Sequence, residues 1–350
     1  MMLAEELKRI KKALQHEENS TSSLATLTDK EVKLVHEIKR QTSKNNRNNL
    51  TRTASYLDFF NRNRAIEWSF LAHMVSRNAG WNMTDLQGSL LGNLLTEEQK
   101  QYFFSVLERA NWLIFQDAYP QLLLFEKSIQ SGTNLFHLFP HFGVSRFMKV
   151  IWEQYVNYKN PRLLTIALII NEQSYIEKRI IQNKNNKATI LETVEEKTQD
   201  LLELSHILFP YKPGYFIGQT VHHFSSLEER ILLGKRLYHL LFDEEYFLSI
   251  YQLALEVPHT GSRHDFMPDM FYYDYQQKKH PSQYYSPLLE NAWSTLEQKP
   301  AEMNDWYNDW KIIHYLKEAE HPIKADITDE YYHTLKKMEL AIDVKNALIK

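Results

Sequence analysis

The sequence predicts an all-α protein, a globular bundle of many helices. Apolar residues recur at the three- and four-residue spacing of helices along most of the chain, and no run alternates cleanly with the period of two that strands show. Glycine is scarce, with 9 residues in 350, which argues against nucleotide-binding α/β folds because these rely on glycine-rich turns. Hydrophobic residues make up 43% of the chain, enough for a large core.

Composition also limits the chemistry and the partners. The absence of cysteine excludes disulfide scaffolds, thiolate zinc sites, iron–sulfur clusters and cysteine nucleophiles. The net charge is −3, and basic residues are too sparse for binding to a phosphate backbone, so nucleic acid is not an expected partner. The first 15 residues are charged and lack the apolar segment of a signal peptide, and the longest apolar run, 163–170, is far shorter than the ~20 residues of a membrane span. We therefore expect a cytoplasmic protein with no transmembrane segment.

The first predicted helix covers residues 2–14, where Leu3, Leu7, Ile10 and Leu14 form a single apolar stripe. We expect this helix to dock on the body of the protein or on a partner rather than on a membrane, because it has acidic residues and no aromatic ones. The polar residues after it indicate a flexible linker, so residues 1–27 are assigned as an amphipathic helix and a linker.

Residues 28–209 are predicted to form the helical core domain. Thr28 and Glu31 have the spacing of a capping box, and Thr51 is expected to cap the next helix after a polar break. Residues 65–77 are apolar on nearly all sides, which is typical of a buried helix, and Gly80 suits the left-handed position at its end. Further helices are predicted at 97–118, 144–158, 162–173 and 188–208.

Residues 210–350 are predicted to form a C-terminal helical region packed on the core. Pro210, Pro213 and Gly214 make the clearest internal break and leave open a division into two helical subdomains. Tyrosines cluster at 272–275 and 284–285, and such clusters are typical of protein interfaces but equally pack the cores of subdomains. Helices are expected at 226–241, 243–256, 288–297, 303–319 and 328–348.

Polar residues interrupt the apolar helices where a core is expected, and buried polar groups are costly unless they are paired or used. We expect arginines and carboxylates from these strings to converge, either as an ion-pair network that holds helices in register or as a pocket for a small anionic or zwitterionic molecule. Backbone donors of the turn at 260–263 are expected to add an anion-binding nest. The candidate ligand-binding residues are Arg52, Arg77, Asn78, Glu108, Asn111, Asp117, Asn171, Glu172, His259, Ser262 and Arg263.

Motifs for catalysis are absent, since the chain has no phosphate loop, nucleophile elbow or dinucleotide-binding glycine pattern. Glu-x-x-His, the spacing that places two metal ligands on one helical face, occurs four times, and two such pairs hold the metals in di-iron bundles. Pairing of glutamate with histidine on a helix surface explains the spacing as well, so no metal ligand is assigned. The sequence identifies no cofactor.

Several of these strings resemble one bacterial family, found in low-GC Gram-positive spore formers and known only as a domain of unknown function. The resemblance covers roughly residues 30–275 and implies a cytoplasmic bacterial protein, without an activity or a substrate. The strings that carry it are Asn48 to Thr53, Met74 to Leu86, Glu108 to Leu122, Ile169 to Gln173 and His259 to Arg263.

Three functions are compatible with the sequence. The first is a helical binding or scaffolding protein with a buried cluster of arginine, carboxylate and amide groups, which would have a protein partner. The alternative is an enzyme or receptor that uses this cluster to bind a small anionic or zwitterionic ligand. A di-metal carboxylate enzyme is the third and least favoured. Whether the protein is an enzyme is left open.

Overall fold

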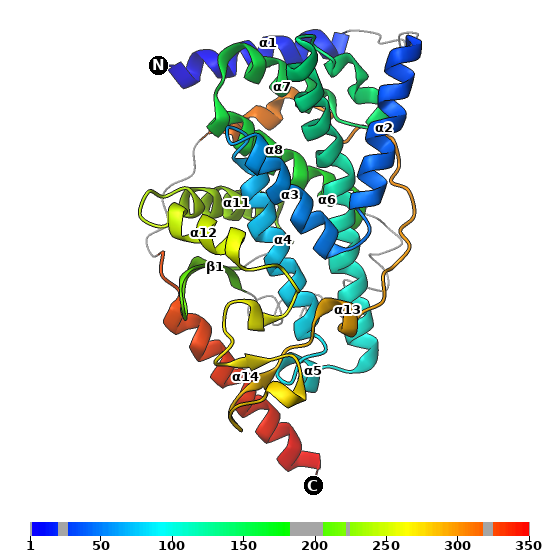
Figure 1. Ribbon diagram of the computed structural model, residues 1–350. Coiled ribbons are helices and arrows are strands. Elements are labelled where there is room, and N and C mark those ends of the chain that lie inside the picture. Colours follow the sequence, from blue (N-terminus) through cyan, green and yellow to red (C-terminus); the bar gives the residue numbers. More distant parts are fainter. Residues whose placement is uncertain (1, 20–26, 183–205, 222–224, 318–324, 350) are drawn as a thin grey trace.

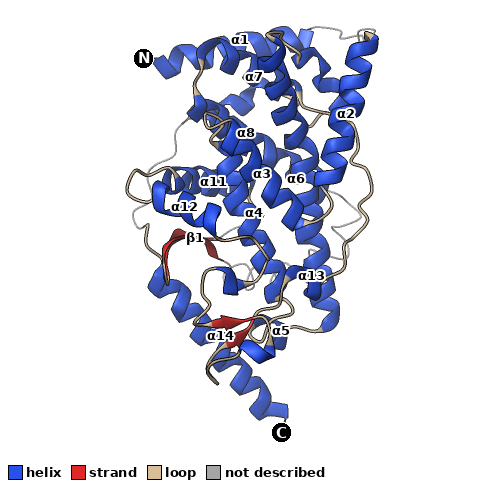
Figure 2. Cartoon of the chain, in the orientation of Figure 1, coloured by secondary structure: helices blue, strands red, loops and turns tan. Residues whose placement is uncertain are grey.

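The computed structural model describes residues 2–19, 27–182, 206–221, 225–317 and 325–349. In these residues the fold is predominantly helical, as predicted, with two short two-stranded sheets added (Figure 2). The longer helices are α1 (Met2–Asn19), α2 (Asp29–Asn45), α3 (Asn49–Arg62), α4 (Trp68–Asp85), α6 (Glu97–Ser131), α7 (Arg146–Tyr158), α8 (Pro161–Ile176), α11 (Leu227–Leu241), α12 (Phe247–Glu256) and α14 (Thr328–Ile349).

The molecule is elongated, with α1 near one end and α14 at the other (Figure 1). α3 packs along α4, and α8 contacts α6, α7 and α11, so that these helices surround the main core. The core is rich in aromatic side chains, and Trp68 and Trp152 are almost completely buried in it, while Trp81 is buried in a second, smaller cluster.

The N-terminal helix is part of this body. Ile10 and Leu14 of α1 are fully buried against α7 and the 3₁₀ helix η6 (Trp310–Leu316), which confirms that this helix docks on the protein. The capping box at the start of α2 is also confirmed: Thr28 accepts a hydrogen bond from the Glu31 backbone, and the Glu31 carboxylate accepts one from the Thr28 backbone.

Three helix boundaries differ from the prediction. The cap of α3 is Asn48, and Thr51 is its partner three residues into the helix rather than the cap. α4 continues to Asp85, so Gly80 lies inside a helix and not at a left-handed end. α6 continues past Pro120 to Ser131 and ends at Gly132, which has a left-handed φ of 67°.

The break at residues 210–214 is a hairpin turn. β1 (His206–Lys212) pairs antiparallel with β2 (Tyr215–Thr220), and Gly214 adopts the positive φ of 73° that the turn requires. The end of the predicted helix at 188–208 is therefore a strand; the rest of it lies outside the described residues. β1 was missed because it is buried on both faces, so its apolar run Ile207–Phe209 lacks alternation.

The C-terminal segments form less helix than predicted before α14. Of residues 288–297 only α13 (Leu289–Ala292) is helical, and within the described residues 303–317 of the helix predicted at 303–319 only η6 is. The chain between them follows the surface of the bundle (Figure 1), where the buried rings of Trp293, Trp306 and Tyr307 fix it in place. The remaining short elements are α5 (Leu91–Leu94), the 3₁₀ helices η1 (Phe136–Phe142), η4 (Arg263–Asp265) and η5 (Tyr275–Gln277), the π-helix η2 (Glu177–Ile181), and the parallel strands β3 (Phe271–Tyr272) and β4 (Tyr284–Tyr285).

Candidate functional site

The predicted polar residues do not meet in one place. Arg52, Arg77 and Arg263 each pair with a different carboxylate, and Asp117 makes amide hydrogen bonds instead. The convergence of the three arginines with three predicted carboxylates is therefore wrong, because two of the arginines find aspartates elsewhere in the chain.

Arg52 and Glu108 form a buried ion pair between α3 and α6. The Arg52 Nη2 donates to the Glu108 Oε2 over 2.5 Å, and the Arg52 Nη1 donates to Asn46 Oδ1 over 3.3 Å. Both side chains are almost inaccessible to solvent. Burial raises the pKa of Glu108 even beside the guanidinium, because removal from water disfavours the charged carboxylate.

Asp117 and Asn171 belong to a network that joins α6 to α8. The Asp117 Oδ2 accepts hydrogen bonds from Asn171 at 2.6 Å and from Gln121 at 2.9 Å. The Asn171 Oδ1 in turn accepts bonds from Ser145 and from the indole of Trp306. These contacts give Asp117 and Asn171 a role in helix packing, and neither lines a cavity described below.

Asp117 gives a prediction for the pH dependence of stability. Burial raises its pKa to about 7, above the ordinary value of 3.8, so the folded protein binds a proton that the unfolded chain releases between about pH 4 and pH 7. The stabilising effect of this proton is complete below pH 4 and is lost as the pH rises through 7. We expect Asp117→Asn to flatten the decline in urea-unfolding free energy by up to about 1.4 kcal/mol per pH unit in that window. An unchanged slope would contradict the shift.

Arg77 and His259 hold the segment after α12 against α4. Arg77 donates to the carbonyls of Val257 and Pro258, and its Nη2 lies 3.9 Å from Asp265. Burial lowers the pKa of Arg77 to about 10. The His259 Nε2 lies 2.8 Å from Asn49 Oδ1 and its Nδ1 3.5 Å from Asp265, while burial lowers its pKa to about 4.

The turn at 260–263 does not leave its backbone donors free for an anion. Asp265 accepts from the backbone N–H of Thr260, and the N–H of Ser262 donates to the Thr260 hydroxyl. The Ser262 hydroxyl donates to the Ser286 carbonyl. Arg263 is held by Asp85, over 2.7 Å. The backbone N–H groups of Thr260, Ser262 and Arg263 thus donate to side chains of the protein itself, those of Asp265, Thr260 and Ser286.

A cavity of about 220 Å³, here called the interior cavity, lies between α3, α4, α6, α8, α11 and β1. Its walls are mainly apolar, with Leu71, Ile169 and Leu237 among them. It contains four of the predicted site residues, namely Arg52, Asn78, Asn111 and Glu172. Asn78 fixes one wall, because its amide group exchanges two hydrogen bonds with the backbone of Leu208 in β1.

Five polar residues of the interior cavity were not predicted as site residues: Tyr56, Ser76, Asn82, Gln173 and Arg230. Tyr56 and Gln173 carry a local signal, since Tyr56 follows Arg52 by one helical turn and Gln173 is adjacent to Glu172. Arg230 comes from α11 and could be found only from the fold.

The charges that line the interior cavity are unevenly paired. Arg230 donates to Glu177 over 2.6 Å, and Arg52 is paired with Glu108. Glu172 accepts a hydrogen bond from Gln173 over 2.9 Å but makes no ion pair in the described part of the chain. Burial raises its pKa to about 7, and hydrogen bonds from Gln173 and Trp68 oppose this rise only in part.

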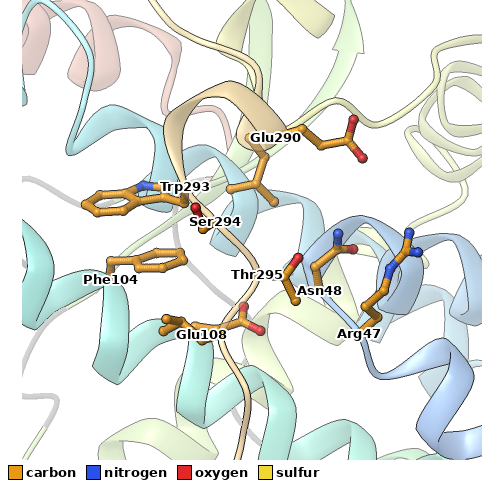
Figure 3. A pocket seen from close by; sticks show the side chains of 10 residues that line it. Arg47, Asn48, Phe104, Glu108, Glu290, Trp293, Ser294 and Thr295 are labelled. Carbon is orange, nitrogen blue, oxygen red and sulfur yellow. The ribbon is translucent and has the colours of Figure 1, made fainter.

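A second cavity of about 500 Å³, here called the outer cavity, lies between the turn after α2, α6, and α13 with the segment that follows it. Phe104 and Trp293 stack on one of its walls with ring centroids 4.2 Å apart. Figure 3 shows the Glu108 carboxyl turned toward Thr295 and Asn48, with Arg47 on the opposite side. Arg52 and Glu108 therefore separate the two cavities, since Arg52 lines the interior one and Glu108 the outer one.

Among the described residues, no three histidine or acidic side chains gather as ligands of a metal ion would. Of the Glu-x-x-His pairs, Glu330 and His333 are not part of such a group, and Glu256 accepts a hydrogen bond from Gln252. Glu203, Glu318 and His321 lie outside the described residues.

Of the helices in the described ranges, none has both the length and the apolar character needed to span a bilayer.

The helical bundle with two cavities divided by an ion pair belongs to the family described as "Protein of unknown function (DUF2515)", whose model matches residues 44–331. The match confirms a family known only as a domain of unknown function and includes residues beyond 275, where no resemblance was predicted. A relative from Bacillus subtilis (strain 168), described as "Uncharacterized protein YppC", is 40% identical over 319 residues, covering 91% of this chain and 97% of the relative. No solved structure matches the chain.

Proposed function

We propose that the protein binds a small, mainly apolar molecule with a basic nitrogen in the interior cavity. The observation that carries this proposal is Glu172, a carboxyl in a mainly apolar cavity that forms no ion pair with the described residues. A protonated amine would supply the missing positive charge, in a setting where low polarity strengthens ion pairs.

The cavity favours a cationic ligand over the anionic one expected from the sequence. Both arginines that line it, Arg52 and Arg230, already form ion pairs with the carboxylates of Glu108 and Glu177. The Glu172 carboxyl forms no ion pair with a described cation. The hydroxyl of Tyr56 makes no hydrogen bond in the described part of the chain, and the charge of Glu172 adds to burial in raising the pKa of this tyrosine. Tyr56 therefore offers a second polar contact beside Glu172.

The volume sets the size of the ligand. A cavity of about 220 Å³ is below the roughly 300–1,000 Å³ of sites for drug-sized molecules. A single ring with a short side chain, such as benzylamine, is a suitable probe, and the apolar walls would contact the ring.

Isothermal titration calorimetry with benzylamine and benzyl alcohol tests the proposal. At pH 8 we expect wild-type protein to bind the amine about tenfold more tightly than the alcohol, because one charge-assisted hydrogen bond contributes about 1.5–3 kcal/mol. Glu172→Gln should remove this preference. The amine affinity should also fall below pH 7, since protonation of Glu172 removes its charge.

A variant whose larger side chain fills the interior cavity provides the control for where the probes bind. Ala110 lines the interior cavity, and Ala110→Leu should weaken the binding of both probes because the leucine occupies the space of the ring. The proposal fails if wild-type protein binds neither probe, or if Glu172→Gln prefers the amine as strongly as wild type does.

Other roles stay predictions. We also propose a cytoplasmic location and no nucleic-acid partner, as the composition indicates. The scaffolding hypothesis keeps partial support from Tyr275, which is exposed and stacks on Tyr285 with ring centroids 5.2 Å apart, whereas Tyr272 is buried.

A further inference from the structure

The outer cavity carries charges of both signs that do not neutralise each other. Glu108 and Arg47 both line it, and they form no ion pair within 4.0 Å. They come from different elements, α6 and the turn between α2 and α3. A cavity with separated opposite charges suits a ligand that carries both.

Glu108 provides an incomplete acceptor. Its Oε2 is bound by Arg52, whereas its buried Oε1 has no hydrogen-bond partner in the described residues. The side chain is almost completely buried, yet its carboxyl borders the cavity (Figure 3). A buried acceptor without a donor is unfavourable, and an ammonium group would satisfy it with a charge-assisted bond.

Arg47 provides the opposite charge. Its side chain is exposed and makes no hydrogen bond or ion pair with the residues that the structure describes. A guanidinium group matches a carboxylate in shape and charge, through two parallel N–H···O bonds. Leu289, Leu296 and the stacked Phe104 and Trp293 supply apolar surface, and the polar residues Asn48, Glu290, Ser294 and Thr295 complete the lining.

We propose that the outer cavity is a second binding site, for a small zwitterion with an apolar side chain, namely a free α-amino acid such as leucine. Its ammonium group binds Glu108, its carboxylate binds Arg47, and its side chain contacts the apolar lining. This site is separate from the amine site of the interior cavity, with Arg52 lying between them.

Calorimetric titration with L-leucine tests the second site. Two matched compounds dissect it: 3-methylbutylamine lacks the carboxylate, and 4-methylpentanoate lacks the ammonium group. All three compounds are titrated into Glu172→Gln, so that the amine gains no charged contact in the interior cavity. We expect leucine to bind at least about tenfold more tightly than either, because each loses one charged contact. If leucine does not bind, or binds no better than both matched compounds, the proposal is wrong.

Arg47→Gln should weaken leucine binding by about tenfold and leave the affinity for 3-methylbutylamine unchanged, because only the carboxylate contact is lost. Since Arg47 is exposed, the variant should fold, which thermal unfolding verifies. Arg40→Gln, an exposed arginine of α2 outside the cavity lining, serves as the matched control. Leucine affinity that is equal in Arg47→Gln and wild type overturns the proposal. Glu172→Gln should bind leucine like wild type, which separates this site from the interior cavity.

Discussion

Arg52→Leu is expected to destabilise the protein by about 3–5 kcal/mol, the range for breaking a buried ion pair by removing one partner. The leucine would leave the Glu108 carboxylate buried in the bundle with its Oε2 unpaired and its Oε1 already without a partner. Asn46 would also lose the hydrogen bond that its Oδ1 accepts from Arg52. The change is measured as the difference in urea-unfolding free energy.

The double variant Arg52→Leu/Glu108→Leu distinguishes an unpaired charge from lost packing. Replacement of both partners of a buried pair by apolar residues is often neutral, so the double variant should be much more stable than Arg52→Leu alone. Lys127→Leu is the matched control, since Lys127 and Glu37 also join two helices but are solvent-exposed, and its effect should stay below about 1 kcal/mol. A double variant as unstable as the two single changes combined would show that packing dominates.

Gly80→Ala is expected to destabilise the protein by about 1–3 kcal/mol through overpacking, although alanine is the better helix former by about 1 kcal/mol at an open position. A Cβ atom at residue 80 would lie 2.4 Å from Asn49 Oδ1 and 2.5 Å from His259 Nε2. Chemical denaturation measures the sign of the change, which decides whether close approach or helix propensity prevails.

Two controls accompany this prediction. Ala54→Gly, at an exposed position of α3, should cost about 1 kcal/mol and shows the propensity effect alone. Combining Gly80→Ala with Asn49→Ala removes one of the crowded atoms, so the loss should be smaller than the sum of the single losses. A stabilised Gly80→Ala variant would mean that α3 and the segment after α12 do not approach α4 at Gly80 as closely as described.

Local signals explain which parts of the fold could be predicted. The capping box of Thr28 and Glu31 and the apolar stripe of Ile10 and Leu14 depend on neighbours within a few residues, and both were read correctly from the sequence. The hairpin was missed because β1 is buried on both faces and so lacks the alternation that marks a strand.

Long-range pairing explains what could not be predicted in the site. The buried position of Arg77 and Arg263 was expected from their apolar surroundings, but their partners Asp265 and Asp85 depend on how distant segments meet. Four of the predicted residues do share the interior cavity, because α3, α4, α6 and α8 each contribute one polar position to a common core. Arg230 and Arg47 complete the two cavities from segments whose sequence patterns showed nothing unusual.

The docking of α1 has a practical consequence for anyone who expresses part of this protein. A fragment cut at the boundaries of the family match, 44–331, would lose α1, most of α2 and nearly all of α14. The faces of α7 and η6 that cover Ile10 and Leu14 would then meet water, as would the surface under Leu335. Hydrophobic surface exposed in this way promotes aggregation, so the 350-residue chain is the sample to purify for the binding experiments.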